Sequence, residues 1–319
     1  MNKPNRIYEL LQDSCAADAK LEQLLIGLVW TLCRSSGSGL SMSPVVPSRT
    51  VAWSGSLQGK PVRDVASWLL SWDPFQASVA LAAVNSSINH RPIPHSELLE
   101  PSLNGANLSV FEYFLPQLLG KKVVVIGHYP GIERYQADMQ LSVLERQPVT
   151  GDLPDTACEF VLPDADWVFL TASSLVNKTL PRLAELSRNA KTVLMGPSVP
   201  WLPQWHEFGI DYLAGVEVVD ETALYHTVAQ AGGVRIFEQG LRYRIAQLTP
   251  NHSLNWIKQQ IAACAAERQR LSQAMDAWYA AGNRQRFPDY ACLEQANKRL
   301  SHLDSSYKPL WDKYSAFST

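Results

Sequence analysis

A cluster of hydrogen-bonding side chains follows a buried apolar run in the segment 166–183, which reads DWVFLTASSLVNKTLPRL. Hydroxyl and amide groups of this kind can hold an anionic or metal-bearing ligand, and an ammonium group can neutralise its charge. Alternatively, the hydroxyls only cap local backbone groups. The polar side chains after the apolar run 167–170 are Thr171, Ser173, Ser174, Asn177, Lys178 and Thr179.

Lys178 is unusual because it stands where the sequence predicts a helix to begin. Asn177 is a good N-cap residue, and Pro181 suits the first helical turn. A cation there faces the positive end of the helix dipole, which costs roughly 0.3–1 kcal/mol when the site is exposed. Lys178 therefore either faces a carboxylate or an anionic ligand, or it extends into water.

Five apolar, β-rich runs alternate with helical stretches between residues 121 and 248. Continuous runs of this type predict a parallel sheet that is covered by helices on both faces. Because the crossover connections are right-handed, the expected fold class is α/β with an open, doubly wound sheet. The predicted strands are 122–126, 140–144, 167–170, 192–195 and 211–214.

Three further loops follow predicted strands and carry glycine, proline or acidic residues. They read GHYPGIE at 127–133, GPSVP at 196–200 and GVEVVDE at 215–221. In open α/β sheets, ligands bind beyond the carboxyl ends of the strands. We therefore expect the loops 127–131, 171–179 and 196–198 to anchor a ligand at one edge of the sheet.

A nucleotide site is an alternative for the same edge. Glu145 stands 18 residues after Gly127, at the end of the next predicted strand. This is typical of the acidic residue that contacts ribose in dinucleotide folds. However, GHYPG is neither a P-loop nor the GxGxxG pattern that lets a backbone approach a pyrophosphate. Glu145 pairs with Arg146 or with a helix terminus in the other interpretation.

The chain divides into three predicted regions. Residues 1–115 read as a mixed α and β domain, with a strand at 24–33 that turns at 35–39, and a helix over about 75–88. Residues 121–248 hold the parallel sheet. Within residues 251–319, apolar side chains recur at intervals of three and then four residues, which predicts an antiparallel helical hairpin.

Composition limits the classes of partner. The 319 residues are 46% hydrophobic and carry a formal charge of −2, which argues against a nucleic-acid or anionic-membrane surface. We expect no signal peptide and no membrane-spanning helix, because no sufficiently long apolar run occurs. The five cysteines are scattered and form no CxxC pair, which argues against a disulfide framework and predicts a cytoplasmic location.

Taken in order, these motifs resemble a bacterial and archaeal family named for heavy-metal chelation, which was long a domain of unknown function. The resemblance rests on VVVIGHYPG, LSVLERQPVTGD, SSLVNKTL, TVLMGPSVP and LAGVEVVDE, and on DPFQASVALAAVNSSIN at 73–89. It covers residues 20–248 approximately. The resemblance implies an enolase-amino-terminal-like domain joined to a Rossmann-like domain, with a ligand in the cleft between them.

The resemblance, together with the position of His128 and of the hydroxyl groups at the strand ends, predicts which residues bind the ligand. Ala172 departs from the family pattern, which has glycine there, and this narrows the backbone freedom of the loop. The predicted ligand-binding residues are Gly127, His128, Pro130, Glu145, Thr171, Ser173, Ser174, Asn177, Lys178, Thr179, Gly196, Pro197, Ser198 and Asp220.

Heavy metals prefer thiolate and imidazole ligands, so His128 and Cys158 are the metal candidates near the predicted edge. Neither has ligand spacing. His90 and His95, with Glu97, are the densest group, although a proline-rich surface loop explains them equally well. A hard divalent cation such as magnesium would instead take carboxylates. Those available are Glu145, Asp152, Asp155, Asp164 and Asp166.

Three functions remain open from the sequence. The first is a cytoplasmic protein that binds a small molecule or a metal between its two domains. The second is an enzyme that acts on an anionic or nucleotide-like metabolite there, with Lys178 neutralising charge and Asp220 or Glu145 as the base. The third is assembly, as a homo-oligomer or with a protein partner, through aromatic residues of the hairpin. These aromatic residues are Trp278, Tyr279, Trp311 and Tyr314.

Overall fold

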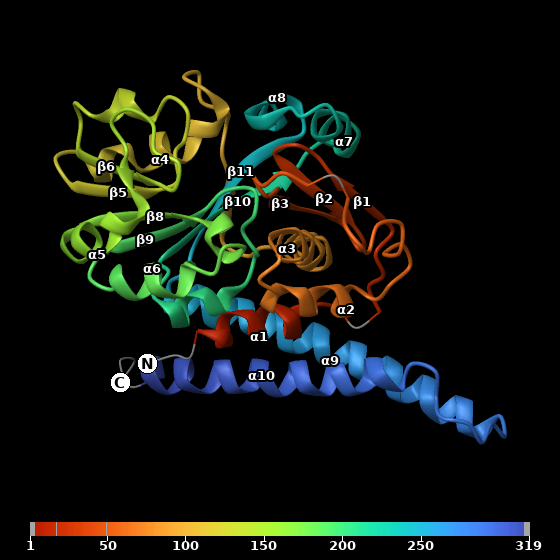
Figure 1. Ribbon diagram of the computed structural model, residues 1–319. Helices are drawn as coiled ribbons and strands as arrows, with labels where there is room; N and C mark the ends of the chain where they lie inside the picture. Colours follow the sequence, from red (N-terminus) through yellow and green to blue (C-terminus); the bar gives the residue numbers. More distant parts are fainter. Residues whose placement is uncertain (1–3, 17, 49, 316–319) are drawn as a thin grey trace.

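The amino-terminal part of the chain forms a three-stranded antiparallel sheet, which lies between α3 on one face and α7 (Glu221–Ala229) on the other (Figure 1). The computed structural model describes residues 4–16, 18–48 and 50–315, without the side chains of 313–315. The strands are β1 (Gln23–Ile26), β2 (Trp30–Arg34) and β3 (Ser38–Met42), and the helices are α1 (Asn5–Ser14), α2 (Val62–Ala66) and α3 (Pro74–Ile88).

Helix α3 is the central helix of this part. Its N-cap is Asp73, whose carboxylate accepts hydrogen bonds from the backbone N–H groups of Phe75 and Gln76. Every residue from Ala77 to Ile88 is buried, because α3 packs against β2 and β3 on one side and against α1, α2 and the turn at 67–70 on the other. The predicted helix at 75–88 is thereby confirmed.

The prediction of one continuous strand at 24–33 is wrong. Gly27 donates its backbone N–H to the carbonyl of Trp30, which closes a tight turn and splits the run into β1 and β2. The turn predicted at 35–39 does connect two strands, β2 and β3. The apolar pattern alone could not reveal the break, because residues on both sides of it are partly or fully buried.

The second sheet has eight strands in the order β4-β11-β10-β9-β8-β5-β6-β7. The strands from β10 to β7 run parallel, whereas β11 is antiparallel to β10 and to β4. The predicted α/β class with a parallel sheet is confirmed. The strands are β4 (Ser96–Leu98), β5 (Lys122–Ile126), β6 (Gln140–Glu145), β7 (Leu153–Pro154), β8 (Trp167–Thr171), β9 (Lys191–Met195), β10 (Tyr212–Val218) and β11 (Leu241–Gln247).

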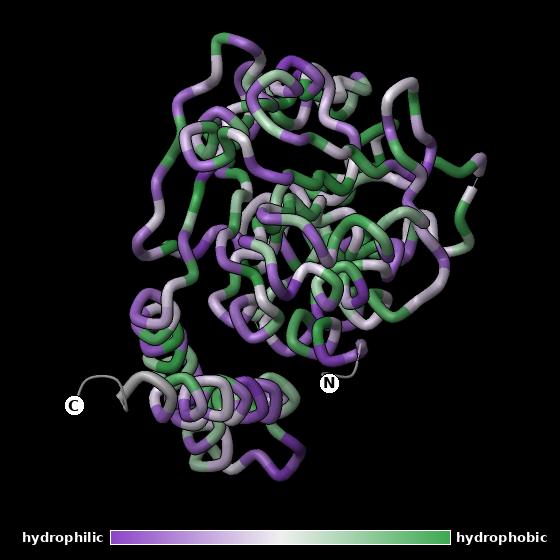
Figure 2. Tube along the Cα trace, turned by 90° about the vertical axis from the view of Figure 1, so that its left-hand side faces the viewer, coloured by the Kyte–Doolittle hydropathy of each residue, from purple (hydrophilic) through white to green (hydrophobic). Residues whose placement is uncertain are grey.

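Helices cover both faces of this sheet, and β4 ties residues before 115 into it. One apolar cluster joins Leu170 and Leu194 of the sheet to Val79 and Leu81 of α3, so the two sheets share a core. Figure 2 shows hydrophobic segments gathered inside this body and hydrophilic ones on its outer loops. The helices are α4 (Ser109–Leu118), α5 (Cys158–Val161), α6 (Leu180–Leu186), α7 (Glu221–Ala229) and α8 (Ile236–Gln239).

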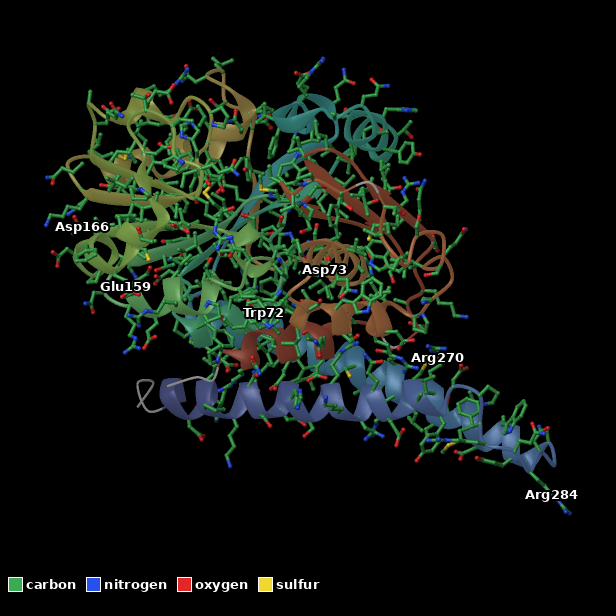
Figure 3. The ribbon with its side chains drawn as sticks, in the orientation of Figure 1. Trp72, Asp73, Glu159, Asp166, Arg270 and Arg284 are labelled. Atoms are coloured by element: carbon green, nitrogen blue, oxygen red, sulfur yellow. The ribbon has the colours of Figure 1, made fainter. Side chains whose placement is uncertain are left out.

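A helical hairpin of α9 (Pro250–Ala280) and α10 (Tyr290–Ser315) completes the chain. Its base packs beneath α1, where Asp13 pairs with Lys298 and His302, each at 2.8 Å. Its tip, marked by Arg284, projects beyond the body, whereas Arg270 lies where the hairpin leaves it (Figures 1 and 3). No helix in the described part of the chain is long and apolar enough to cross a membrane.

Candidate functional site

The chain changes direction across the large sheet between β5 and β8. From β5 it first winds outward to β6 and β7, and it then returns to β8 on the other side. The loops after β5 and β8 therefore diverge at their carboxyl ends, which is where open α/β sheets bind ligands. Gly127 follows β5 with a φ of 96°, and a Cβ there would stand 3.2 Å from Cγ2 of Thr171. Gly127 therefore lies close to the end of β8, and its positive φ favours glycine at this point.

Three hydroxyl groups lie at this switch point. The Thr171 and Ser173 hydroxyls are 3.0 Å apart, and both side chains are half-buried. The Tyr129 phenol interacts with Thr171, and its oxygen lies 3.5 Å from where a Cβ on Gly196 would stand. Burial raises the pKa of Tyr129 far above its usual range, so the phenol stays a neutral donor. Ser174 does not join this set, because its hydroxyl is buried and donates to the carbonyl of Thr171.

A histidine–carboxylate pair borders the hydroxyl groups. The His128 Nδ1 lies 3.1 Å from both carboxylate oxygens of Asp152, whose side chain is only 4% exposed, against 31% for His128. A carboxylate can only accept, so Nδ1 is the donor of this hydrogen bond, and the lone pair of a neutral imidazole in this position is on Nε2. Glu145 accepts hydrogen bonds from the backbone N–H groups of His128 and Arg146. The arrangement presents an oriented imidazole at the end of β5.

The end of the 171–179 loop differs from the prediction. Helix α6 begins at Leu180 with Thr179 as its cap position, so Asn177 is not the N-cap. Asn177 instead accepts from both the backbone N–H and the hydroxyl of Thr179. Lys178 is left-handed, with a φ of 68°, and its ammonium donates to the carbonyl of Val176 at 3.1 Å. No described contact joins Lys178 to Thr171 or Ser173.

The turn after β9 connects the two sheets. The Ser198 hydroxyl accepts from the backbone N–H of Met42, and its carbonyl accepts from Nδ2 of Asn85. Pro197 is buried and Ser198 is 2% exposed. Ser198 therefore links β3 and α3 to the end of β9, while Gly196 lies next to Tyr129.

The remaining predicted residues lie apart from the hydroxyl groups. Asp220 is the N-cap of α7, where it accepts from the backbone N–H groups of Thr222 and Ala223. Pro130 is exposed, and its carbonyl accepts from Asn107. Gly215, expected in a loop, lies inside β10 because that strand continues to Val218.

The described residues contain no group of three or more histidine, cysteine or acidic side chains that could hold a metal ion. His128 has Asp152 as its partner, and Cys158 begins α5 beside apolar side chains. Asp166 precedes β8 and so lies at the opposite end of the strands, where it accepts from the backbone N–H of Lys122 (Figure 3). His95 is stacked on His252, with ring centroids 4.3 Å apart.

The sequence interpretation missed two contributors. Tyr129 was not proposed, although it lies inside the GHYPG motif; an aromatic residue with a polar tip directly after a buried strand was the available signal. Asp152 was considered for a magnesium ion and not as the partner of His128. No local pattern predicts that contact, since 24 residues separate the two.

The fold defines an α/β protein in which a large, mostly parallel sheet presents its strand ends to a smaller antiparallel sheet. Two family models, both described as "Putative heavy-metal chelation", match residues 109–247 and 8–88. A crystal structure of a family member of unknown function from Desulfitobacterium hafniense is 32% identical, with a TM-score of 0.65. The similarity covers 76% of this chain and 97% of that one. The chain belongs to this family.

Two further proteins are similar to this chain at lower identity or over a shorter stretch. A family protein of unknown function from Pyrococcus horikoshii has the same fold, with a TM-score of 0.61 at 20% identity over 76% of this chain and 99% of that one. An uncharacterized protein of Methanocaldococcus jannaschii is 30% identical over 107 residues, or 32% of this chain. The match spans 40% of that relative's length. Both family models end before the hairpin.

Proposed function

We propose that this protein binds a small anionic chelator together with its metal ion, at the ends of β5, β6 and β8. The observation that carries the proposal is the pairing of His128 with buried Asp152. A carboxylate that accepts from one ring nitrogen orients the imidazole and raises the basicity of the other nitrogen, as it does in many metal sites. Nε2 of His128 is thus available as one metal ligand.

The other donor atoms would come from the bound molecule, because the described residues form no three-donor group. The hydroxyls of Thr171, Ser173 and Tyr129 supply hydrogen bonds to its oxygen atoms. When the bound molecule supplies most of the metal ligands, the protein can bind a chelated heavy metal, as the family name suggests, without a preformed metal site of its own. A ligand of this type has hard or borderline donors and several negative charges.

Thermal denaturation with defined probes tests the proposal. Zn²⁺ or Ni²⁺ premixed with citrate is expected to stabilise the protein, by about 2.7 kcal/mol at a hundredfold excess over Kd. The variant His128→Asn should lose this stabilisation. His302→Asn is the matched control, because His302 also pairs through Nδ1 with a carboxylate, that of Asp13, but at the base of the hairpin.

Three outcomes of this experiment would count against the proposed binding of a metal chelate. Equal stabilisation of His128→Asn and the wild-type protein would contradict the proposal, and so would stoichiometric binding of the free metal ion. Stabilisation by phosphorylated acids or nucleotides without metal would favour an enzyme, in which His128 serves as a general base oriented by Asp152.

A second function, self-association through the hairpin, has separate support. Between α9 and α10 runs an open groove of about 620 Å³, which Arg268, Asp304 and Lys308 line. Because the groove has both basic and acidic side chains, the basic residues of one copy can face the acidic residue of a second copy. Trp278 and Tyr279 mainly stabilise the tip of the hairpin. Trp278 packs on the Phe287 ring, and the Tyr279 hydroxyl accepts a hydrogen bond from the backbone N–H of Phe287. Trp311 is 48% exposed, and the side chain of Tyr314 lies outside the described residues.

Charge reversal in the groove tests this function. The double variant Arg268→Glu and Lys308→Glu makes these three lining residues all acidic, so the opposite charges of two copies could no longer face each other. We expect a dimer of the wild-type chain and a monomer of this variant by light scattering. Arg284→Glu, at the exposed tip, is the matched control and should leave the dimer unchanged. Equal masses for the double variant and the wild-type chain would exclude this role of the groove.

A further inference from the structure

One edge of the small sheet is left open by the rest of the chain. The strand order is β1-β2-β3, so β1 and β3 lie at the two ends of this sheet. The edge of β3 is occupied, because the backbone N–H of Met42 donates to the Ser198 hydroxyl. The carbonyl of Leu40 in the same strand accepts from Asn85. Figure 1 shows β1 at the outer side of the molecule, away from β5.

The backbone of β1 has hydrogen-bonding groups that no strand pairs with. Gly27, directly after β1, donates its N–H to the carbonyl of Trp30 in β2. Because the pairs of an antiparallel ladder alternate, Leu24 and Ile26 direct their N–H and C=O groups away from β2. No residue in the described part of the chain pairs with them on that side. Such an unpaired edge is a template for a further strand.

A short outer segment already pairs with this edge just before β1 begins. The N–H of Leu21 donates to the carbonyl of Lys60, and the carbonyl of Leu21 accepts from the N–H of Gly59. The loop 51–58, which precedes Gly59, makes no backbone hydrogen bond to β1 among the described residues. The outer segment therefore stops at Gly59, and the place beside β1 stays open.

A cavity of about 740 Å³ lies between β1 and the loop 51–58. Its apolar lining comes from Leu24 and Ile26 of the strand and from Trp53 and Leu57 of the loop. Trp53 packs on Trp68 with ring centroids 5.3 Å apart, and Leu57 is buried, so the loop is held in place. The cavity is thus bounded on two sides and is open along the direction of the strand.

We propose that this cavity binds an extended peptide of another protein, which adds to β1 as a fourth strand of the small sheet. The backbone of the peptide would pair with Leu24 and Ile26, and its alternate side chains would contact Trp53 and Leu57. A second copy of this chain would not fit. If its β1 paired here, its own β2 would stand on the far side, where the loop 51–58 already lies.

Charge at the cavity indicates one further property of the peptide. The charged residues among its lining are Glu22 and Arg34. Arg34 pairs with Glu221 at 2.6 Å, whereas Glu22 is exposed and has no ion pair among the described residues. A basic residue of the peptide therefore complements Glu22 at the end of the cavity next to Leu21.

Peptide selection tests the proposal. Random decapeptides displayed on phage would be selected on the full chain, and the consensus peptide would be labelled with fluorescein for anisotropy measurements. We expect apolar residues at every second position and a lysine or arginine. Ser54→Trp, which fills the cavity from the loop, should weaken binding about tenfold or more. Ala52→Trp, at an exposed position of the same loop that does not line the cavity, is the matched control and should bind as the wild-type protein does.

Methylation of the peptide backbone distinguishes strand pairing from the binding of side chains alone, and it leaves the protein unchanged. N-methylation should lower the affinity about tenfold or more at every second residue and little at the residues between, since only alternate N–H groups of an added strand face β1. Glu22→Gln should lower the affinity about threefold. The assignment would be overturned if no peptide were enriched, if Ser54→Trp bound as the wild-type protein does, or if the effect of methylation did not alternate.

Discussion

Replacing Gly39 with alanine is expected to destabilise the amino-terminal sheet by roughly 3 kcal/mol or more. Gly39 lies in β3, against α3. A Cβ added there would stand 2.0 Å from the backbone nitrogen of Ser86 and 2.3 Å from the carbonyl oxygen of Ala82. These are backbone atoms of a buried helix, so no side chain can rotate away. The sheet and α3 would have to separate.

Urea denaturation measures this effect, and Gly282→Ala is its matched control. Gly282 follows α9 with a φ of 85°, and an added Cβ would meet no atom within 4 Å. Its replacement should cost only the backbone strain, about 1–2 kcal/mol. If Gly39→Ala lost no more stability than Gly282→Ala, the close packing of β3 on α3 would be disproved.

Replacing Asn85 with aspartate should be nearly as damaging, at roughly 3 kcal/mol near neutral pH. Asn85 is fully buried, and its Nδ2 donates to the carbonyls of Leu40 and Ser198. It thereby joins both sheets. An aspartate cannot donate when ionised, so two buried carbonyls would lose their partner and would face a buried negative charge.

The loss of stability caused by Asn85→Asp should increase as the pH rises. Burial raises the pKa of the new carboxyl in the folded state above about 3.9, the value in the unfolded chain. Below pH 4 both states are protonated and the carboxyl can donate one hydrogen bond, so the loss relative to the wild-type protein is smallest. It grows as pH rises toward the folded-state pKa. Asn89→Asp, at a half-buried amide, should lose less. A difference independent of pH would contradict this account.

Most of the large sheet could be predicted because its parallel strands are buried on both faces. Runs such as KVVVI at 122–126 are apolar throughout and have few other stable conformations. Strand β11 was missed, although its signal was present. Leu241, Tyr243 and Ile245 are buried and alternate with Arg242 and Arg244, which is the period of a half-covered strand. Edge strands β4 and β7 are too short to show any period.

The candidate site was only partly predictable, because residue types do not reveal which polar groups are already satisfied. The sequence placed Thr171, Ser173 and His128 at strand ends, where the structure has them. It could not show that Ser198 already accepts hydrogen bonds from the backbone of Met42 and the side chain of Asn85, residues that precede it by more than 110 positions. It also could not reveal that Lys178 would fold toward Tyr8. Such long-range pairings depend on the packing of two sheets.

The junction at Ser198 has an evolutionary consequence. The turn after β9 is held by atoms from α3 and β3, and it continues directly from Gly196, which lies beside the Tyr129 hydroxyl. Substitutions on one side of this junction are therefore expected to be compensated by substitutions on the other. The hairpin has apolar clusters of its own, but Trp256 of α9 belongs to the main core, so we expect its base to be retained while its tip varies in length.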